Sequence, residues 1–223
     1  MSKLYVAYGS NLNIDQMKRR CPDAEIVTTS FINNYQLTFR GDYRGHGVAN
    51  IEPKKGTRVP VGVWQISPAD EVALDRYEGY PTLYTKQNFM VMVNGERHKA
   101  MAYVMQPGFD PVPPSDGYLQ TIADGFDDFK IDKQVLWDGV CWALKQTADS
   151  WKSFLAAFCR WQVRYHWKIC PRCGRPTVKA KTATNAWSRH ADVYICDECG
   201  TDEAIRHFGK IIKPLNEWAI FKE

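Results

Sequence analysis

The chain has 223 residues, 44% of them hydrophobic and 24% charged, a composition that fits a folded globular protein and excludes disordered, collagen-like and coiled-coil chains. No apolar run approaches the roughly 18 residues of a membrane-spanning helix, and the mean hydropathy is −0.43, so we expect no membrane segment. The net charge of +4 is unevenly distributed, because residues 151–195 carry nine lysines and arginines but one acid. The length lies between one domain and two, and we place the domains at residues 1–148 and 149–223.

The first elements are predicted from apolar periodicity and capping signals. Residues 3–8 form an apolar run that predicts a buried strand ending at Gly9. Asn13, with a glutamine three residues later, resembles the capping signal of a short helix. Residues 31–40 alternate between apolar and polar side chains, except at Asn33, and therefore predict a half-buried strand.

Further strands and a helix follow. Residues 59–63 alternate again, and Pro60 predicts that this strand lies at a sheet edge, since proline cannot donate to a strand ladder. A Ser-Pro pair opens a helix predicted over residues 67–77. Residues 88–105 form two alternating segments around an Asn-Gly pair at residues 94–95, the sequence typical of a tight hairpin turn.

Helical spacing dominates later in the chain. Apolar residues at 118–123 predict a helix after a proline-rich loop, and those at 151–165 predict another that leads into a cysteine cluster. Strands outnumber helices before residue 148, so the chain is expected to be an α+β protein.

The loop at residues 8–12, Tyr-Gly-Ser-Asn-Leu, stands between the first strand and the first helix. Backbone N–H groups converge at such a junction and can bind a carboxylate or an oxyanion. The alternative is an ordinary turn, because glycine and polar residues are what any such turn requires.

Glu78 is expected at the C-terminal end of the second predicted helix, where the helix dipole disfavours an anion. Gly79 follows it and can adopt the left-handed cap conformation. Glu78 is therefore either a solvated surface carboxylate or a residue held there for a function.

Taken in order, the Tyr8-Gly9-Ser10-Asn11 loop, the segment from Leu74 to Gly79, the hairpin, and the Pro-Pro-Ser at residues 113–115 followed by Tyr118 resemble the γ-glutamylcyclotransferase family. That family includes AIG2-like and γ-glutamylamine members, and the resemblance covers roughly residues 3–125. It implies a small mixed β-barrel with flanking helices, in which the loop and the glutamate face each other across a cavity.

The resemblance also implies roles for individual residues. Glu78 matches the family's catalytic acid/base, and Tyr8, Gly9, Ser10, Asn11 and Leu12 match its substrate cradle. Tyr84, Tyr103 and Tyr118 match tyrosines near the cavity, although aromatic residues in strands are usually core residues.

The implied reaction suits these residue types. A γ-glutamyl amide holds its α-amine near its own γ-carbonyl, so closure to 5-oxoproline needs proton transfer and no protein nucleophile, metal or cofactor. We therefore expect a γ-glutamylcyclotransferase-like enzyme, of the acyltransferase or lyase type, that acts on a small γ-glutamyl substrate. The alternative is a non-catalytic module that binds a small ligand, with its C-terminal part contacting protein or nucleic acid.

Four of the seven cysteines, Cys170, Cys173, Cys196 and Cys199, form two Cys-x-x-Cys-Gly pairs separated by 22 residues. Such paired thiolates predict a tetrahedral zinc site in a zinc-ribbon module, preceded by a helix. With four protein ligands, the zinc is expected to be structural.

The basic residues near the cysteines have two interpretations. With interleaved aromatic residues they could bind single-stranded nucleic acid, or they could balance the negative charge of a zinc tetrathiolate, which we favour. We expect a reducing location, the cytoplasm of a bacterial cell or of a phage-infected cell, because the N-terminus does not resemble a signal peptide. The sequence is compatible with a homo-oligomer.

Overall fold

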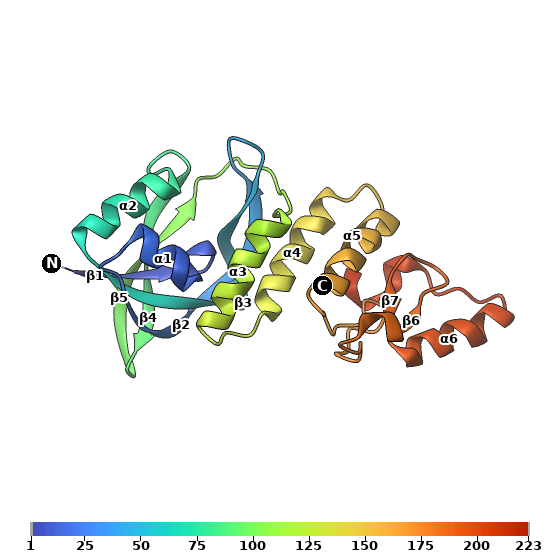
Figure 1. Ribbon diagram of the computed structural model, residues 1–223. Coiled ribbons are helices and arrows are strands. Elements are labelled where there is room, and N and C mark those ends of the chain that lie inside the picture. Colours follow the sequence, from blue (N-terminus) through green and yellow to red (C-terminus); the bar gives the residue numbers. More distant parts are fainter. Residues whose placement is uncertain (1, 223) are drawn as a thin grey trace. The chain divides into compact units, whose positions relative to one another are not determined.

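The computed structural model describes residues 2–222, and the chain divides into two compact units, Met1–Thr147 and Ala148–Glu223 (Figure 1). This division falls one residue before the predicted boundary. Among the described helices, none combines the length and the apolar character needed to cross a membrane.

The first unit is built on a mixed five-stranded sheet of order β2-β3-β1-β5-β4, in which β1 and β5 are parallel and the other neighbours antiparallel. The strands are β1 (Lys3–Ala7), β2 (Glu25–Gly41), β3 (Gly47–Ile66), β4 (Tyr84–Val93) and β5 (Glu96–Met105). The sheet curls until its edge strands meet, since the backbone N–H of Met92 in β4 donates to the Ser30 hydroxyl in β2 at 2.9 Å. The predicted α+β class and small barrel are therefore confirmed.

The turn and bulge positions follow the local sequence. Asn94 and Gly95 join β4 to β5 with φ angles of 51° and 85°, so the predicted hairpin is confirmed. The break in the alternation of β2 corresponds to a register shift between Asn33 and Tyr35, where Asn34 has φ 62°.

The prediction that Pro60 marks an edge strand was wrong. Strand β3 lies inside the sheet, between β2 and β1. However, β1 pairs only with residues 62–66 of β3, whereas Pro60 lies opposite Phe31 of β2. Because β3 extends beyond its shorter neighbour, Pro60 is placed where the missing N–H group costs no bond to β1.

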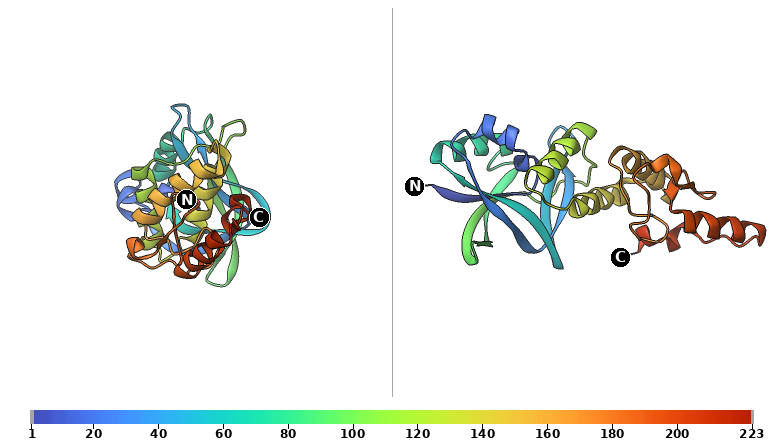
Figure 2. Two further views of the ribbon diagram at one scale, coloured as in Figure 1. Left: turned by 90° about the vertical axis from the view of Figure 1, so that its right-hand side faces the viewer. Right: turned by 60° about the horizontal axis from the view of Figure 1, so that its bottom comes forward.

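The helices of the first unit are α1 (Ile14–Arg20), α2 (Pro68–Glu78), α3 (Asp116–Asp128) and α4 (Gln134–Thr147), with a short 3₁₀ turn η1 (Ser10–Leu12) before α1. In Figure 2, α1, α2 and α3 lie along one side of the curled sheet. The Asn13 side chain caps α1, and Ser67 forms a capping box with Asp70 at the start of α2. Helix α4 was not among the predicted elements; it packs on β2, with Gly139 lying against the backbone of Leu37.

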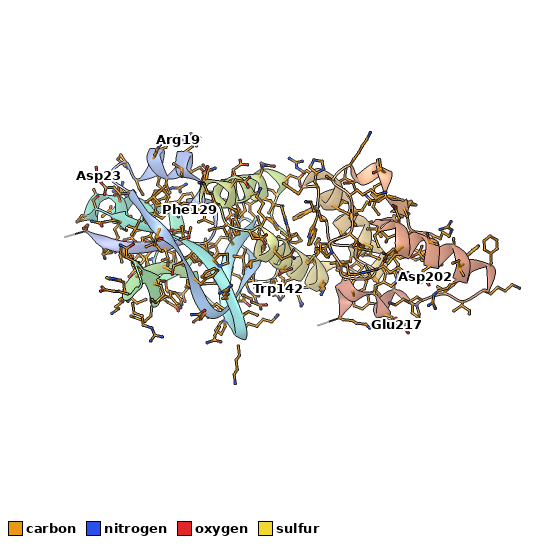
Figure 3. The ribbon with its side chains drawn as sticks, turned by 90° about the horizontal axis from the view of Figure 1, so that it is seen from below. Arg19, Asp23, Phe129, Trp142, Asp202 and Glu217 are labelled. Atoms are coloured by element: carbon orange, nitrogen blue, oxygen red, sulfur yellow. The ribbon has the colours of Figure 1, made fainter. Side chains whose placement is uncertain are left out.

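Two close approaches fix the packing beneath η1. The ring of Phe129, labelled in Figure 3, packs edge-on against Trp64 of β3 with 5.4 Å between centroids. A Cβ atom on Gly62 would lie 2.6 Å from this ring. A Cβ atom on Gly125 of α3 would lie 2.6 Å from backbone atoms of η1 and Asn13, so α3 can approach η1 this closely because residue 125 is glycine.

The second unit contains α5 (Trp151–Arg164), the two-residue strands β6 (Ala186–Trp187) and β7 (Tyr194–Ile195), and α6 (Asp197–Phe208). The predicted helix from Trp151 is confirmed, and Ser150 forms its capping box. The small core of the second unit includes the fully buried side chains of Phe158 and Trp218. The first cysteine pair lies in a loop, whereas the second opens α6, with Cys196 as its N-cap.

Candidate active site

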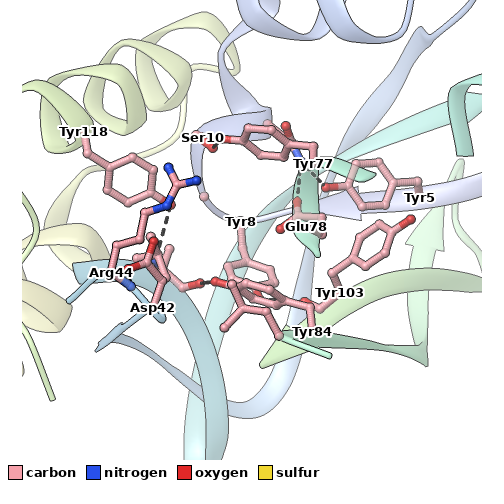
Figure 4. A pocket seen from close by; sticks show the side chains of 15 residues that line it. Tyr5, Tyr8, Ser10, Asp42, Arg44, Tyr77, Glu78, Tyr84, Tyr103 and Tyr118 are labelled. Carbon is pink, nitrogen blue, oxygen red and sulfur yellow. Dashed lines mark hydrogen bonds between the residues drawn. The ribbon is translucent and has the colours of Figure 1, made fainter. Parts of the chain in front are cut away.

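A cavity of about 300 Å³ opens in the first unit where η1, the end of α2, the turn between β2 and β3, and the start of α3 converge (Figure 4). Most of its side chains are polar or aromatic. They belong to Tyr5, Tyr8, Gly9, Ser10, Asn11, Asp42, Arg44, Val48, Ala49, Tyr77, Glu78, Leu83, Tyr84, Tyr103 and Tyr118.

Glu78 lies on the cavity wall facing the loop at residues 8–12. Gly79 ends α2 in the left-handed conformation, with φ 63° and ψ 34°, which turns the chain directly after Glu78. The Asn11 amide nitrogen donates to Glu78 Oε1 and to the Tyr5 hydroxyl, each at 2.8 Å. The two segments that the sequence analysis singled out therefore meet in a single cavity.

Burial raises the pKa of Glu78 to about 7, against opposing effects from the Arg20 charge and the Asn11 hydrogen bond. Protein atoms replace most of the water that would solvate this carboxylate, and desolvation disfavours the charged form. Glu78 can therefore both accept and donate a proton near neutral pH.

Arg20, at the end of α1, fixes the orientation of Asn11. Its guanidinium donates to the Asn11 carbonyl oxygen and stacks over the Tyr77 ring, 3.2 Å from the centroid. The Tyr77 hydroxyl is in turn hydrogen-bonded to Ser10 Oγ at 2.9 Å. The amide of Asn11 is thus held with its nitrogen toward Glu78.

The tyrosine hydroxyl groups are largely used to position the walls. Tyr8 donates to the backbone carbonyl of Tyr103, and Tyr84 donates to the carbonyl of Ala49, both at 2.6 Å. The N–H of Ala49 donates to the Tyr118 hydroxyl at 3.2 Å. Burial raises the pKa of each of these four tyrosines, so they stay neutral at physiological pH.

Tyr103 connects the cavity to a charged network on α2. Its hydroxyl donates to Asp75 at 2.5 Å, and Lys86 of β4 forms ion pairs with Asp75 at 2.8 Å and Glu71 at 2.7 Å. Because Asp75 lies one turn before Glu78 on the same helix, this network holds the end of α2 against β4 and β5.

The structure places most of the predicted site residues on the cavity wall, but Leu12 is not among them. Its side chain is fully buried and lies next to Gly62, where it fills space under the sheet. Tyr5, Asp42, Arg44 and Tyr77 line the cavity without having been predicted. Tyr77 had one sequence signal, since it directly precedes Glu78, whereas Arg44 had none.

The cysteine cluster lies in the second unit. The sulfur atoms of Cys170, Cys173, Cys196 and Cys199 all lie within 4.8 Å of one another. Four sulfurs placed tetrahedrally about 2.3 Å from a zinc ion would be about 3.8 Å apart, so this set fits a metal. The N–H of Cys196 points to Cys170 Sγ at 3.4 Å, and the buried Arg172 guanidinium donates to the Cys199 carbonyl at 3.3 Å.

Comparisons with known proteins match the first unit. The family profile for gamma-glutamyl cyclotransferase, AIG2-like, matches residues 5–125. The gamma-glutamylcyclotransferases of Bos taurus and Homo sapiens are 27% and 29% identical over 132 and 133 residues, in each case 56% of this chain and 70% of the relative.

Two solved structures also resemble this chain. An uncharacterized protein from Homo sapiens is 27% identical with a TM-score of 0.53, covering 57% of this chain and 79% of its own. A structure described as gamma-glutamyl cyclotransferase shares the fold at 24% identity, with a TM-score of 0.56 and coverage of 66% and 88%. With the family profile spanning more than half of its residues, this chain belongs to the gamma-glutamyl cyclotransferase, AIG2-like family.

Proposed function

We propose that the protein is a γ-glutamylcyclotransferase that converts a γ-glutamyl amide into 5-oxoproline and a free amine, with Glu78 as the proton carrier. The observation that supports this most directly is the carboxylate of Glu78, which lies inside the cavity, hydrogen-bonded to Asn11 at 2.8 Å, with a pKa raised to about 7 by burial. The relatives named gamma-glutamylcyclotransferase support the same reaction.

Glu78 carries protons in both directions during the reaction. As carboxylate it removes a proton from the substrate's α-ammonium group, and the freed α-amine attacks the γ-carbonyl carbon, forming the new C–N bond of the five-membered ring. The protonated Glu78 then gives this proton to the leaving nitrogen as the original C–N bond breaks. The ring nitrogen loses its remaining extra proton to the regenerated carboxylate, which passes it to the released amine, so the products are 5-oxoproline and an ammonium ion. A group with a pKa near 7 is present in both forms at neutral pH, which is the condition for this double role.

The loop at residues 8–12 provides the complementary donors. Ser10 and Asn11 begin the 3₁₀ turn η1, and the first N–H groups of such a turn have no partner within it. They are available for the α-carboxylate of the substrate or for the oxyanion that develops on the γ-carbonyl. Their position opposite Glu78 favours turnover over simple binding, because donors and proton carrier share one cavity.

The test is 5-oxoproline release from a panel of γ-glutamyl amides by wild type and Glu78→Gln. Glutamine keeps the size and the hydrogen bond from Asn11 but cannot carry a proton, so we expect the rate to fall by about 10²- to 10⁴-fold. The control is Glu96→Gln, which changes an exposed carboxylate on the β4–β5 hairpin. Equal rates for wild type and Glu78→Gln would show that Glu78 is not the proton carrier.

We further propose that the cysteine cluster binds zinc with a structural role. When bound, zinc would link the loop of Cys170 and Cys173 to the start of α6 at Cys196 and Cys199, and four protein sulfurs leave no position for substrate. Purified protein should contain about one zinc per chain. Chelation of the metal should lower the unfolding temperature of the second unit and leave the far-ultraviolet circular dichroism of the sheet in the first unit unchanged. A protein that is purified without metal, and whose unfolding temperature does not change when zinc is added, would refute the site.

We propose that the basic residues of the second unit balance local negative charge, which includes nearby acids as well as a zinc tetrathiolate. Arg172 pairs with Asp202 at 2.5 Å, and Lys179 pairs with Asp197 at 2.5 Å. These pairings support charge compensation over nucleic-acid binding. Retardation of single-stranded oligonucleotides at low salt, lost at high salt, would reverse this proposal. Cys21, Cys141 and Cys159 are buried and unbridged, which supports a reducing cytoplasmic location.

A further inference from the structure

The last turn of α6 and the chain directly after it form an exposed apolar and cationic surface, the α6 tip (residues 205–213). Figures 1 and 2 show α6 projecting from the body of the second unit. The phenyl ring of the tip is 88% exposed and its three isoleucines are 59% to 67% exposed; these residues are Ile205, Phe208, Ile211 and Ile212. Single exposed apolar residues are normal on a protein surface, whereas a cluster of this kind marks a contact site.

Backbone hydrogen bonds hold this surface together. Gly209 ends α6, and Lys210 then reverses the chain in the left-handed conformation, with φ 54°. The N–H of Ile211 donates to the carbonyl of Arg206 at 2.9 Å, which returns the chain to the last turn of the helix. The Ile211 side chain lies beside Gly209, where an added Cβ atom would be 3.8 Å from its Cδ1 atom. Phe208 and Ile211 are therefore presented together at the end of α6.

The charged side chains of the α6 tip are all basic. Between positions 204 and 216 the sequence has no aspartate or glutamate, and its basic residues are Arg206, His207, Lys210 and Lys213. Arg206 is paired with Asp202 at 2.8 Å, but within the described part of the chain neither Lys210 nor Lys213 forms an ion pair. An occupant of this surface must therefore be negatively charged where it meets the lysines and apolar where it meets Phe208.

An anionic lipid bilayer meets both requirements. Its headgroup phosphates attract lysines, and the boundary with its acyl chains accepts apolar side chains. A lysine can keep its ammonium group among the headgroups while its aliphatic stem lies along the apolar layer. The projection of α6 favours a bilayer over a folded partner, because a protein would need a hollow shaped for the Phe208 ring, whereas a fluid bilayer deforms around it.

We propose that the α6 tip binds the surface of an anionic lipid bilayer, with Phe208 and the isoleucines at the boundary between headgroups and acyl chains, and with Lys210 and Lys213 on the headgroups. The contact is peripheral, and it uses no residue of the first unit. It is therefore independent of the proposed function.

The test is co-sedimentation of the full chain, at low ionic strength, with vesicles of phosphatidylcholine alone or of phosphatidylcholine and phosphatidylglycerol in a two-to-one ratio. We expect the anionic vesicles to be bound about 10- to 30-fold more tightly, because the unpaired lysines are attracted by their surface potential. Phe208→Ser should weaken this binding by about 10- to 100-fold, because the ring no longer leaves water. Lys210→Glu should weaken binding to the anionic vesicles by about 10- to 30-fold.

Two control variants separate the α6 tip from the general positive charge and exposed apolar surface of the chain. Lys152→Glu reverses an exposed lysine at the start of α5, and Met90→Ser removes a side chain that is 55% exposed on β4. Neither should weaken vesicle binding by more than about 2-fold. Because Phe208 and Lys210 are exposed, their substitutions should leave the unfolding temperature unchanged, so that lost binding does not reflect lost folding.

The inference is overturned if wild type does not sediment with the anionic vesicles, or if Lys152→Glu weakens binding as much as Lys210→Glu. A dimer in solution that Phe208→Ser dissociates, with no binding to vesicles, would instead assign the tip to a second copy of the chain. Binding of a single-stranded oligonucleotide that Lys210→Glu abolishes, again without vesicle binding, would assign it to nucleic acid. None of these results bears on the cyclotransferase proposal, because 5-oxoproline release is measured without lipid.

Discussion

The raised pKa of Glu78 has a consequence for stability that can be measured without any substrate. The pKa is about 7 in the folded chain, against 4.5 for an ordinary glutamate, because burial disfavours the carboxylate. Between these two values the unfolded chain releases the Glu78 proton while the folded chain keeps it. The contribution of Glu78 to stability is therefore full below about pH 4.5 and is lost as the pH rises to about 7.

The magnitude follows from the size of the shift. At 1.36 kcal/mol per pKa unit, full ionisation of Glu78 costs about 3 kcal/mol, most of which is lost between pH 5 and pH 8. Because the Glu78 side chain is partly solvated through the cavity, about 3 kcal/mol is the upper limit of this loss of stability. Glu78→Gln removes the titration but keeps an acceptor for Asn11, so it should be more stable than wild type at pH 8 and gain little at pH 5.

Urea unfolding of wild type and Glu78→Gln at pH 5, 6, 7 and 8 measures this directly, because titrations common to both proteins cancel in the difference between their free energies of unfolding. Because the chain has two compact units, the unfolding transition to follow is that of the first unit, which contains Glu78. Glu25→Gln, at an exposed carboxylate at the start of β2, is the matched control for the loss of a surface charge. A Glu78→Gln difference that stays constant from pH 5 to pH 8 would refute the raised pKa and, with it, the physical basis for the proton carrier.

Two further predictions concern the surroundings of this site. Arg20→Gln removes the charge that lowers the pKa of Glu78, so the acid limb of the pH profile of kcat/KM should move to higher pH. The control Arg19→Gln, on the exposed side of α1, should not move this limb. An unshifted limb in Arg20→Gln would show that the Arg20 charge does not influence the pKa of Glu78. Gly125→Ala should cost about 1–3 kcal/mol of stability, because its Cβ would lie 2.6 Å from backbone atoms of the η1 segment. Gly117→Ala on the same helix, where nothing lies within 4 Å, should be neutral or stabilising in the same urea titration, and equal effects at the two glycines would contradict the close packing of α3 on η1.

Local sequence determined the elements whose rules act over a few residues. The Asn94-Gly95 turn was predictable because both residues must adopt positive φ, the start of α2 was predictable from the Ser-Pro pair at residues 67–68, and α5 was predictable from its apolar spacing. The two cysteine pairs likewise predicted a cluster from their spacing. The meeting of the η1 loop with the end of α2 was expected only from the family resemblance, since no local rule joins residues 67 positions apart.

Tertiary structure decided which side chains surround the cavity. Arg20 reaches Asn11 because α1 folds back beside η1, and Arg44 reaches the cavity because β2 and β3 extend past the short β1 and close in a turn at its wall. Leu12, by contrast, lies next to the site in sequence but turns under the sheet, because a 3₁₀ turn points successive side chains to different sides. The sequence alone therefore determined the turns, the caps and the cysteine cluster, whereas the cavity surface depended on the curl and strand order of the sheet, which arise from contacts between segments distant in the chain.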